Sequence, residues 1–140
     1  MKNDSLLIIL GNQLFPLKYI QNISSKNIFM KEDYGLCTDV NHHKLKILFF
    51  LTSMREYRDN LIRHGFNVIY HSIEEQNFKL DYLDLLNKEI FKNKFHTINY
   101  FEIEDNTFKE KFLCYISESK NKFVEHVSPM FINNKKKFHH

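Results

Sequence analysis

Short runs of apolar residues alternate along the chain with segments in which apolar residues recur every three or four positions. The first run covers residues 5–10, is rich in leucine and isoleucine, and is followed by Gly11. A continuous apolar run of this length is typical of a strand that is buried on both faces of a parallel sheet. Similar short runs predict further strands over residues 27–30, 66–70, 96–101 and 122–127.

Three segments between these runs carry the spacing of an amphipathic helix. The longest covers residues 42–64 and places apolar residues on one face, at Ile47, Phe50, Leu51, Met54, Tyr57 and Leu61. Gly65 follows in the position where a left-handed residue commonly ends a helix. Two further helices are predicted over residues 78–92 and 106–117. This alternation predicts an α/β fold, a Rossmann-like doubly wound domain whose mainly parallel sheet has helices on both faces.

Composition supports a single folded domain. The chain has 140 residues, of which 43% are hydrophobic and 15% aromatic, with 3 glycines and 2 prolines. A chain of this length is expected to form one domain, which we assign to residues 1–132, with a basic C-terminal tail at 133–140. The net charge is +3, and the run Lys135-Lys136-Lys137 is more typical of a solvated terminus than of a phosphate-binding segment. No stripe of lysine and arginine indicates a dedicated duplex-binding protein.

The two cysteines, Cys37 and Cys114, are far apart and form no C-x-x-C motif. They therefore do not indicate a disulfide framework or a metal-binding set, and we expect two buried thiols in a reducing, cytoplasmic environment. The apolar run at 5–10 is too short for a signal peptide, and no run approaches the length of a membrane-spanning helix. Membrane association is not expected.

In an open parallel sheet, ligands bind beyond the carboxyl ends of the strands. Two predicted loops reach that edge, Gly11-Asn12-Gln13-Leu14 after the first strand and the polar segment 31–41 after the second. Gly11 would allow close approach of the backbone to a ligand, although ordinary turn chemistry explains Gly11-Asn12 about equally well. The pair His42-His43 opens the long helix, but adjacent histidines do not have the spacing of helical metal ligands. No metal site is predicted.

Charged residues elsewhere have simpler interpretations. The acidic segment Glu102-Ile103-Glu104-Asp105 follows the predicted strand 96–101, and it is more typical of a helix cap than of an acid–base pair. Arg55, Arg58 and Arg63 are expected on the solvated face of the long helix.

The chain has two motif blocks, at residues 8–14 and 40–47, that together with shorter segments resemble the photolyase-related proteins, the family of bacterial iron–sulfur cryptochromes and (6-4) photolyases. The segment Ile8-Ile9-Leu10-Gly11-Asn12-Gln13-Leu14 resembles the family's I-L-G-D-Q-L, and Val40-Asn41-His42-His43-Lys44-Leu45-Lys46-Ile47 resembles its V-x-H-H-K-x-K-I. Further similarity lies in Met30-Lys31-Glu32, Ser53-Met54-Arg55, the segment 65–70, Phe101-Glu102-Ile103-Glu104-Asp105 and Pro129-Met130-Phe131-Ile132. The resemblance covers nearly the whole chain.

The resemblance implies an N-terminal antenna domain that holds a light-harvesting chromophore, 6,7-dimethyl-8-ribityllumazine. In the family, a longer helical region binds FAD, a [4Fe–4S] cluster and the DNA lesion. The resemblance therefore implies that this chain is a truncated or split form. Its partner would be a helical FAD-binding region or a separate chain, and it would meet DNA only through the complete protein. Photolyase catalysis is not expected from this chain by itself.

The resemblance also implies which residues face the chromophore. Gly11, Gln13, Glu32 and His43 match the family's motif, together with Leu14 in the first loop. Asn12 stands where the family has aspartate, so it keeps an acceptor and loses the charge. Leu36 and Asp39 fall where the family has an acid and an aromatic residue.

An alternative function is a stand-alone or degenerate Rossmann-like module that binds a partner protein or a small ligand without photochemistry. An independent hydrolase is disfavoured because no nucleophile–base pattern is found. A domain that docks on a helical region is expected to expose an apolar patch. The candidates are Phe112, Leu113, Tyr115 and Ile116, or the tail at 130–132.

Overall fold

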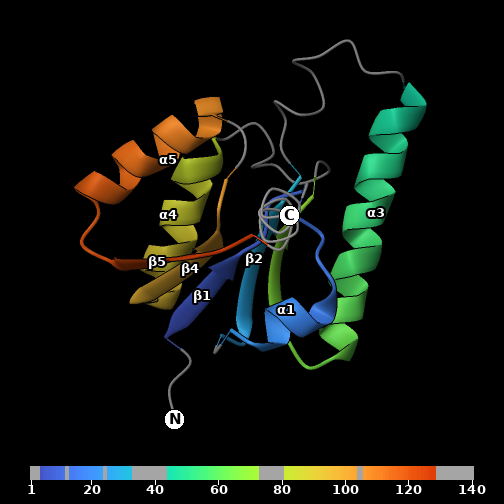
Figure 1. The fold of residues 1–140 in the computed structure, drawn as a ribbon, viewed down its shortest axis with the longest axis horizontal. Helices are drawn as coiled ribbons and strands as arrows, with labels where there is room; N and C mark the ends of the chain where they lie inside the picture. The colour runs from blue at the N-terminus through green and yellow to red at the C-terminus, as the bar shows by residue number, and fades with distance from the viewer. Residues whose placement is uncertain are drawn as a thin grey trace, which may run out of the picture.

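The sheet has five parallel strands. A computed structural model describes residues 4–11, 13–23, 25–32, 44–72, 81–103 and 106–128. Its strands are β1 (Ser5–Ile8), β2 (Asn27–Lys31), β3 (Asn67–His71), β4 (Thr97–Phe101) and β5 (Lys122–His126). They pair in the order β3-β2-β1-β4-β5, and every pair is parallel (Figure 1). The predicted α/β, Rossmann-like fold is confirmed.

Helices cover both faces of this sheet. They are α1 (Leu17–Gln21), α3 (Lys44–Arg63), α4 (Tyr82–Asn93) and α5 (Asn106–Glu118). Figure 1 shows α4 and α5 on one side of the sheet and α1 and α3 on the other. Three of these helices match the sequence prediction, but α1 was not predicted. It is a single turn that begins after Pro16, too short for an amphipathic pattern to repeat.

Local residue chemistry explains where the longer helices end. Gly65, with φ +91°, follows α3 in the left-handed conformation that the sequence predicted. Asp81 caps α4 by accepting a hydrogen bond from the backbone N–H of Leu83 at 3.2 Å. Because Asp81 is the N-cap, α4 starts later than the predicted residue 78. The predicted start of α3 at residues 42 and 43 lies outside the described residues.

The alternating side chains of β1 divide the core into two layers. Leu6 and Ile8 pack with α4 and α5, while Leu7 and Ile9 pack with α1 and α3. Successive residues of a strand point to opposite faces, so a strand at the centre of a covered sheet must be apolar at every position. This explains the unbroken apolar run near the N-terminus.

Buried polar side chains bind the start of β1 to its two neighbours. Asn27 Nδ2 and Ser25 Oγ each donate to the Ser5 carbonyl at 3.1 Å. On the other side of β1, Asn99 Nδ2 lies 3.4 Å from the Leu6 carbonyl. On the first side, Asn27 Oδ1 also accepts from Nδ2 of the exposed Asn67 on β3 at 3.0 Å. A buried amide must be hydrogen-bonded to be tolerated. Asn27, Ser25 and Asn99 are therefore compatible with a buried position because each has a partner.

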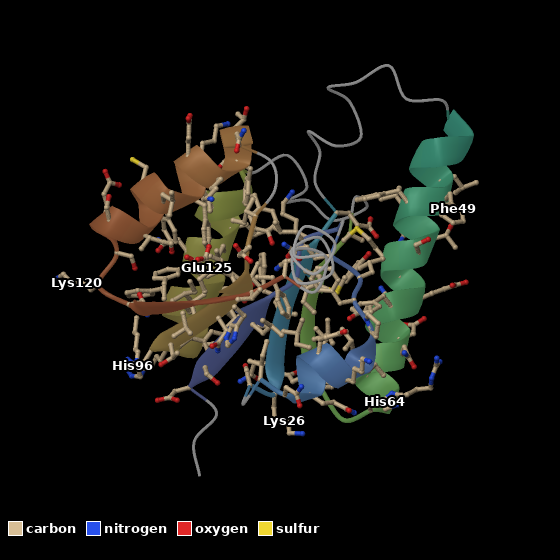
Figure 2. The ribbon with its side chains drawn as sticks, in the orientation of Figure 1. Lys26, Phe49, His64, His96, Lys120 and Glu125 are labelled. Atoms are coloured by element: carbon tan, nitrogen blue, oxygen red, sulfur yellow. The ribbon has the colours of Figure 1, made fainter. Side chains whose placement is uncertain are left out.

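The proposed apolar patch on α5 is largely a core surface. Phe112 is 1% exposed and packs in the layer with α4, where Tyr115 and Ile116 are partly buried against it. Leu113 is 48% exposed, and the tail at 130–132 lies outside the described residues. Cys114 is exposed, so the prediction of a buried thiol was wrong there, and Cys37 is not among the described residues. Figure 2 shows Phe49, another exposed apolar residue, on the outer side of α3.

Candidate functional site

The carboxyl edge of the sheet has its topological switch between β1 and β4, because the strand order runs one way from β1 to β3 and the other way from β4 to β5. Gln13 joins the two loops at this point. Its Oε1 accepts from the Leu10 N–H at 3.3 Å, and its Nε2 donates to the Glu102 carbonyl at 2.9 Å. Gln13 is 5% exposed. The predicted site residue Gln13 therefore lies at the expected edge, with its amide bound within the chain.

Glu102 connects this loop to the end of β5. Its backbone N–H donates to the His126 carbonyl at 3.0 Å, and its Oε1 accepts from the Ser128 N–H at 3.1 Å. The interpretation of Glu102 as a helix cap was therefore wrong, while Glu104 and Asp105 lie outside the described residues. The hydrogen bonds of Gln13 and Glu102 link the segments that follow β1, β4 and β5 into one rim.

Gly11 is a point of close packing between the first loop and α3. A Cβ at this position would overlap Phe50 Cζ and lie 3.1 Å from Met54 Sδ. The space in front of Gly11 is thus filled by α3 side chains in this structure. Leu14, in the same loop, packs against the core layer that includes Met54. Gly11 allows the loop and the helix to approach each other, a role that the sequence did not indicate.

Glu32 follows β2 and is fully buried, with 0% exposure. Arg55 on α3 binds it with two hydrogen bonds, Nε to Oε2 at 2.7 Å and Nη2 to Oε1 at 3.0 Å. The Tyr70 hydroxyl at the end of β3 also donates to Glu32 Oε2. A bidentate guanidinium–carboxylate pair is among the strongest polar contacts in proteins. The network ties α3 to the carboxyl ends of β2 and β3.

Arg58 extends the network, since its guanidinium lies 4.7 Å from the centre of the Tyr70 ring. The expected solvated face is therefore wrong for Arg55 and Arg58, whereas Arg63 is exposed as predicted. Burial, with a further effect from the hydrogen bond to Glu32, raises the pKa of Tyr70 above its usual value. Tyr70 thus remains a protonated donor at neutral pH.

The structure brings some of the predicted site residues together and leaves others undescribed. Gly11, Gln13, Leu14 and Glu32 all follow β1 or β2 at the carboxyl edge. Asn12, Leu36, Asp39 and His43 lie outside the described residues, as does His42. Sequence reasoning missed Arg55 and Tyr70, although a buried acid at the end of an apolar strand does signal that a cationic or hydroxyl partner is needed.

Within the part of the chain that the structure describes, no group of three or more His, Cys, Asp or Glu side chains could hold a metal ion. No helix among the same residues has both the length and the apolar character needed to cross a bilayer.

His126, at the end of β5, gives the rim a pH dependence. Its Nε2 lies 2.9 Å from Asn99 Oδ1, and burial lowers its pKa below the usual 6.5. The unfolded chain then binds a proton more readily than the folded chain, so stability is lost as pH falls below about 6.5 toward the folded-state pKa.

We expect urea denaturation between pH 7.5 and 5.5 to show this loss, and we expect His126→Gln to reduce the slope of unfolding free energy against pH. The control is His96→Gln, at an exposed histidine before β4, and an unchanged slope in His126→Gln would contradict the prediction.

Comparison with known protein families gives a match over nearly the whole chain. The family model of deoxyribodipyrimidine photo-lyase-related proteins matches residues 7–140. No curated protein matches the chain significantly. The match covers more than nine-tenths of the chain, and it includes every helix and strand described above except the first two residues of β1. The chain therefore belongs to the deoxyribodipyrimidine photo-lyase-related protein family.

Proposed function

We propose that this chain is an antenna-type domain of a photolyase-related protein and holds a light-harvesting chromophore at the carboxyl edge of its sheet. The proposal rests on one observation. At the topological switch, the side-chain amide of Gln13 hydrogen-bonds to the segments that follow β1 and β4 and so holds these two loops together. This is the position at which open α/β sheets bind planar cofactors. FAD, the [4Fe–4S] cluster and the DNA lesion belong, in this proposal, to a helical region or partner chain.

The proposed chromophore is 6,7-dimethyl-8-ribityllumazine, which absorbs light and transfers the excitation energy when it is bound. The described residues form the edge at which this proposal places the chromophore, and their polar contacts are made within the chain. Gln13 and Glu32 direct their polar atoms to other groups of the chain, so they position the two loops and α3. Direct contacts are assigned to Asn12, Leu36, Asp39 and His43, whose roles stay predictions from the family resemblance.

The alternative is a Rossmann-like module that binds a partner or small ligand without photochemistry. One observation favours it, because the amide of Gln13 and the carboxylate of Glu32, two groups expected to face the chromophore, already have partners within the chain. A ligand would have to compete with these hydrogen bonds or rely on other residues. The two proposals therefore differ in whether a lumazine binds at all.

A titration separates the two proposals. Fluorescence anisotropy of 6,7-dimethyl-8-ribityllumazine with the purified 140-residue chain should saturate, while FAD should show no saturable binding. Asn12→Asp restores the charge that the family motif carries and should tighten lumazine binding by about tenfold, as one charge-assisted hydrogen bond predicts. Asn22→Asp makes the same change at the exposed end of α1 and should leave affinity within about twofold.

The outcomes are distinct. Absence of lumazine binding in both the native chain and Asn12→Asp would overturn the antenna proposal and leave the module. Tight FAD binding by this chain would overturn the assignment of the flavin to another region.

A further inference from the structure

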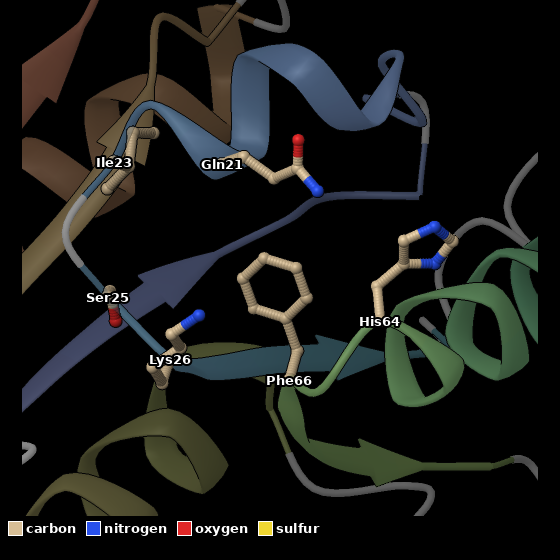
Figure 3. Close-up of a pocket in the computed structure, with 6 residues that line it drawn as sticks. All are labelled: Gln21, Ile23, Ser25, Lys26, His64 and Phe66. Carbon is tan, nitrogen blue, oxygen red and sulfur yellow. The ribbon is translucent and has the colours of Figure 1, made fainter.

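A small pocket lies at the opposite, amino edge of the sheet, where α1 and α3 end and where β2 and β3 begin. Its volume is about 200 Å³, and it is lined by Gln21, Ile23, Ser25, Lys26, His64 and Phe66 (Figure 3). It shares no residue with the carboxyl edge. We propose that this pocket binds a small organic carboxylate that carries an apolar ring.

The floor of the pocket is apolar and fixed by the core. Ile23 and Phe66 are buried members of the layer that packs with α1 and α3. Ser25 is also buried, and its hydroxyl is held by the Ser5 and Asn27 carbonyls at 3.1 and 3.0 Å. A floor whose side chains are already ordered adds little entropic cost when a ligand binds.

The rim of the pocket carries groups that donate hydrogen bonds. Figure 3 shows Gln21, Lys26 and His64 around the Phe66 ring. Lys26 Nζ lies 5.3 Å from the centre of that ring, and within the described residues it forms no ion pair. His64 Nδ1 lies 2.8 Å from the Asn60 carbonyl, which can only accept, so the Nδ1 N–H donates within the chain and His64 is not counted among the donors to a ligand. The rim thus offers an ammonium group and an amide to a carboxylate.

The electrostatic environment favours an anion. Near the ends of α3, α4 and α5 and the starts of the strands at this edge, the described residues include six exposed cations, Lys26, Arg63, Lys92, Lys94, Lys120 and Lys122. Two exposed acids, Asp4 and Glu118, lie at the same edge. The C-termini of α3, α4 and α5 each contribute roughly half a negative charge. The excess of four positive charges is larger than the summed partial negative charge of the three helix C-termini, so the edge remains positive.

Backbone hydrogen bonds hold these residues in one row. Asn67 N–H donates to the Lys26 carbonyl at 2.8 Å, His96 N–H to the Asp4 carbonyl at 2.7 Å, and Lys122 N–H to the His96 carbonyl at 3.0 Å. Figure 2 shows Lys26, His64 and His96 along this edge. The pocket therefore opens on a positive surface, and Lys26 is the cation that lies inside it.

The size of the pocket limits the ligand. A water molecule occupies about 30 Å³ in the liquid, so the pocket has room for roughly seven waters or one substituted ring. The ring of such a ligand would lie on Ile23 and Phe66, and its carboxylate would accept from Lys26 and Gln21. Benzoate matches this description and serves as the probe.

Nuclear magnetic resonance of the ¹⁵N-labelled chain tests the proposal. Benzoate should produce saturable shifts at the backbone amides of Ile23, Ser25, Lys26 and Phe66, with a dissociation constant of about 1 mM, as expected for a fragment-sized ligand. Benzamide, which lacks the charge, and acetate, which lacks the ring, should each bind at least fivefold more weakly. Lys26→Gln should weaken benzoate binding at least fivefold, and Lys120→Gln, at an exposed lysine of the same edge, less than twofold.

Three results would overturn the inference. Shifts that are spread along the edge or do not saturate by 20 mM benzoate would mean that no pocket is filled. Equal weakening by Lys26→Gln and Lys120→Gln would mean that the general charge of the edge attracts the ligand. Equal binding of benzamide and benzoate would mean that the carboxylate is not recognised.

Discussion

Replacement of Arg55 by methionine should lower the free energy of unfolding by about 3 kcal/mol, because it removes the guanidinium that binds the fully buried carboxylate of Glu32. Methionine keeps the apolar stem of the side chain and removes the guanidinium. Tyr70 still donates to Glu32 in the variant, and Arg55 is itself 35% exposed, so we expect the lower end of the range for broken buried pairs. Urea denaturation monitored by circular dichroism measures the change.

A double-mutant cycle identifies the cause of this loss. In a Glu32→Gln background the buried charge is absent, so the further change Arg55→Met should cost less than half as much. Arg63→Met, on the exposed side of the same helix, should change stability by no more than about 0.5 kcal/mol. Equal costs for Arg55→Met in both backgrounds would show that the guanidinium acts through packing and not through Glu32.

Replacement of Phe112 by alanine should cost about 3 to 5 kcal/mol, the range for a buried aromatic ring. Its ring lies at 4.8 Å from Tyr100, 5.9 Å from Phe123 and 6.0 Å from Phe108 between ring centres. Removal would leave a cavity among rigid rings that cannot easily collapse into it. The same urea denaturation measures this loss.

The adjacent Leu113 provides the control. It is on the outer side of α5, so Leu113→Ala should cost less than about 1 kcal/mol. A small effect of Phe112→Ala, comparable with that of Leu113→Ala, would mean that Phe112 is a surface residue, as the sequence had suggested. The pair thus tests whether α5 presents its aromatic face to the core.

The fold could be read from the sequence because its main signals are local. The predicted strands over 66–70 and 122–127 differ from β3 and β5 by one residue at one or both ends, and the left-handed Gly65 was predicted at the end of α3. Apolar runs, helical spacing and a terminal glycine each depend on residues that are close in the chain. The single turn of α1 has no such repeated signal.

The site was less predictable because its contacts are long-range. The sequence pattern gave Arg55 a solvated position, since helical spacing cannot show that Glu32, 23 residues earlier, ends a strand directly beside it. Likewise, Gly11 was interpreted through its own turn, whereas its open side faces Phe50 on α3. The sequence placed Gln13 and Glu32 at the carboxyl edge of the sheet, where the structure also has them, but the partners of these two residues depend on how distant elements pack.

The polar contacts at the start of β1 have a consequence for how the chain reaches its fold. Because β1 is apolar on both sides, sliding it by one residue would exchange the two layers and leave almost as much apolar surface buried. Hydrophobicity therefore specifies its alignment weakly. In the observed alignment Asn27, Ser25 and Asn99 bind the Ser5 and Leu6 carbonyls, and a slide by one residue would break these contacts. These three short polar side chains thus favour the observed pairing over shifted pairings that would bury almost as much apolar surface.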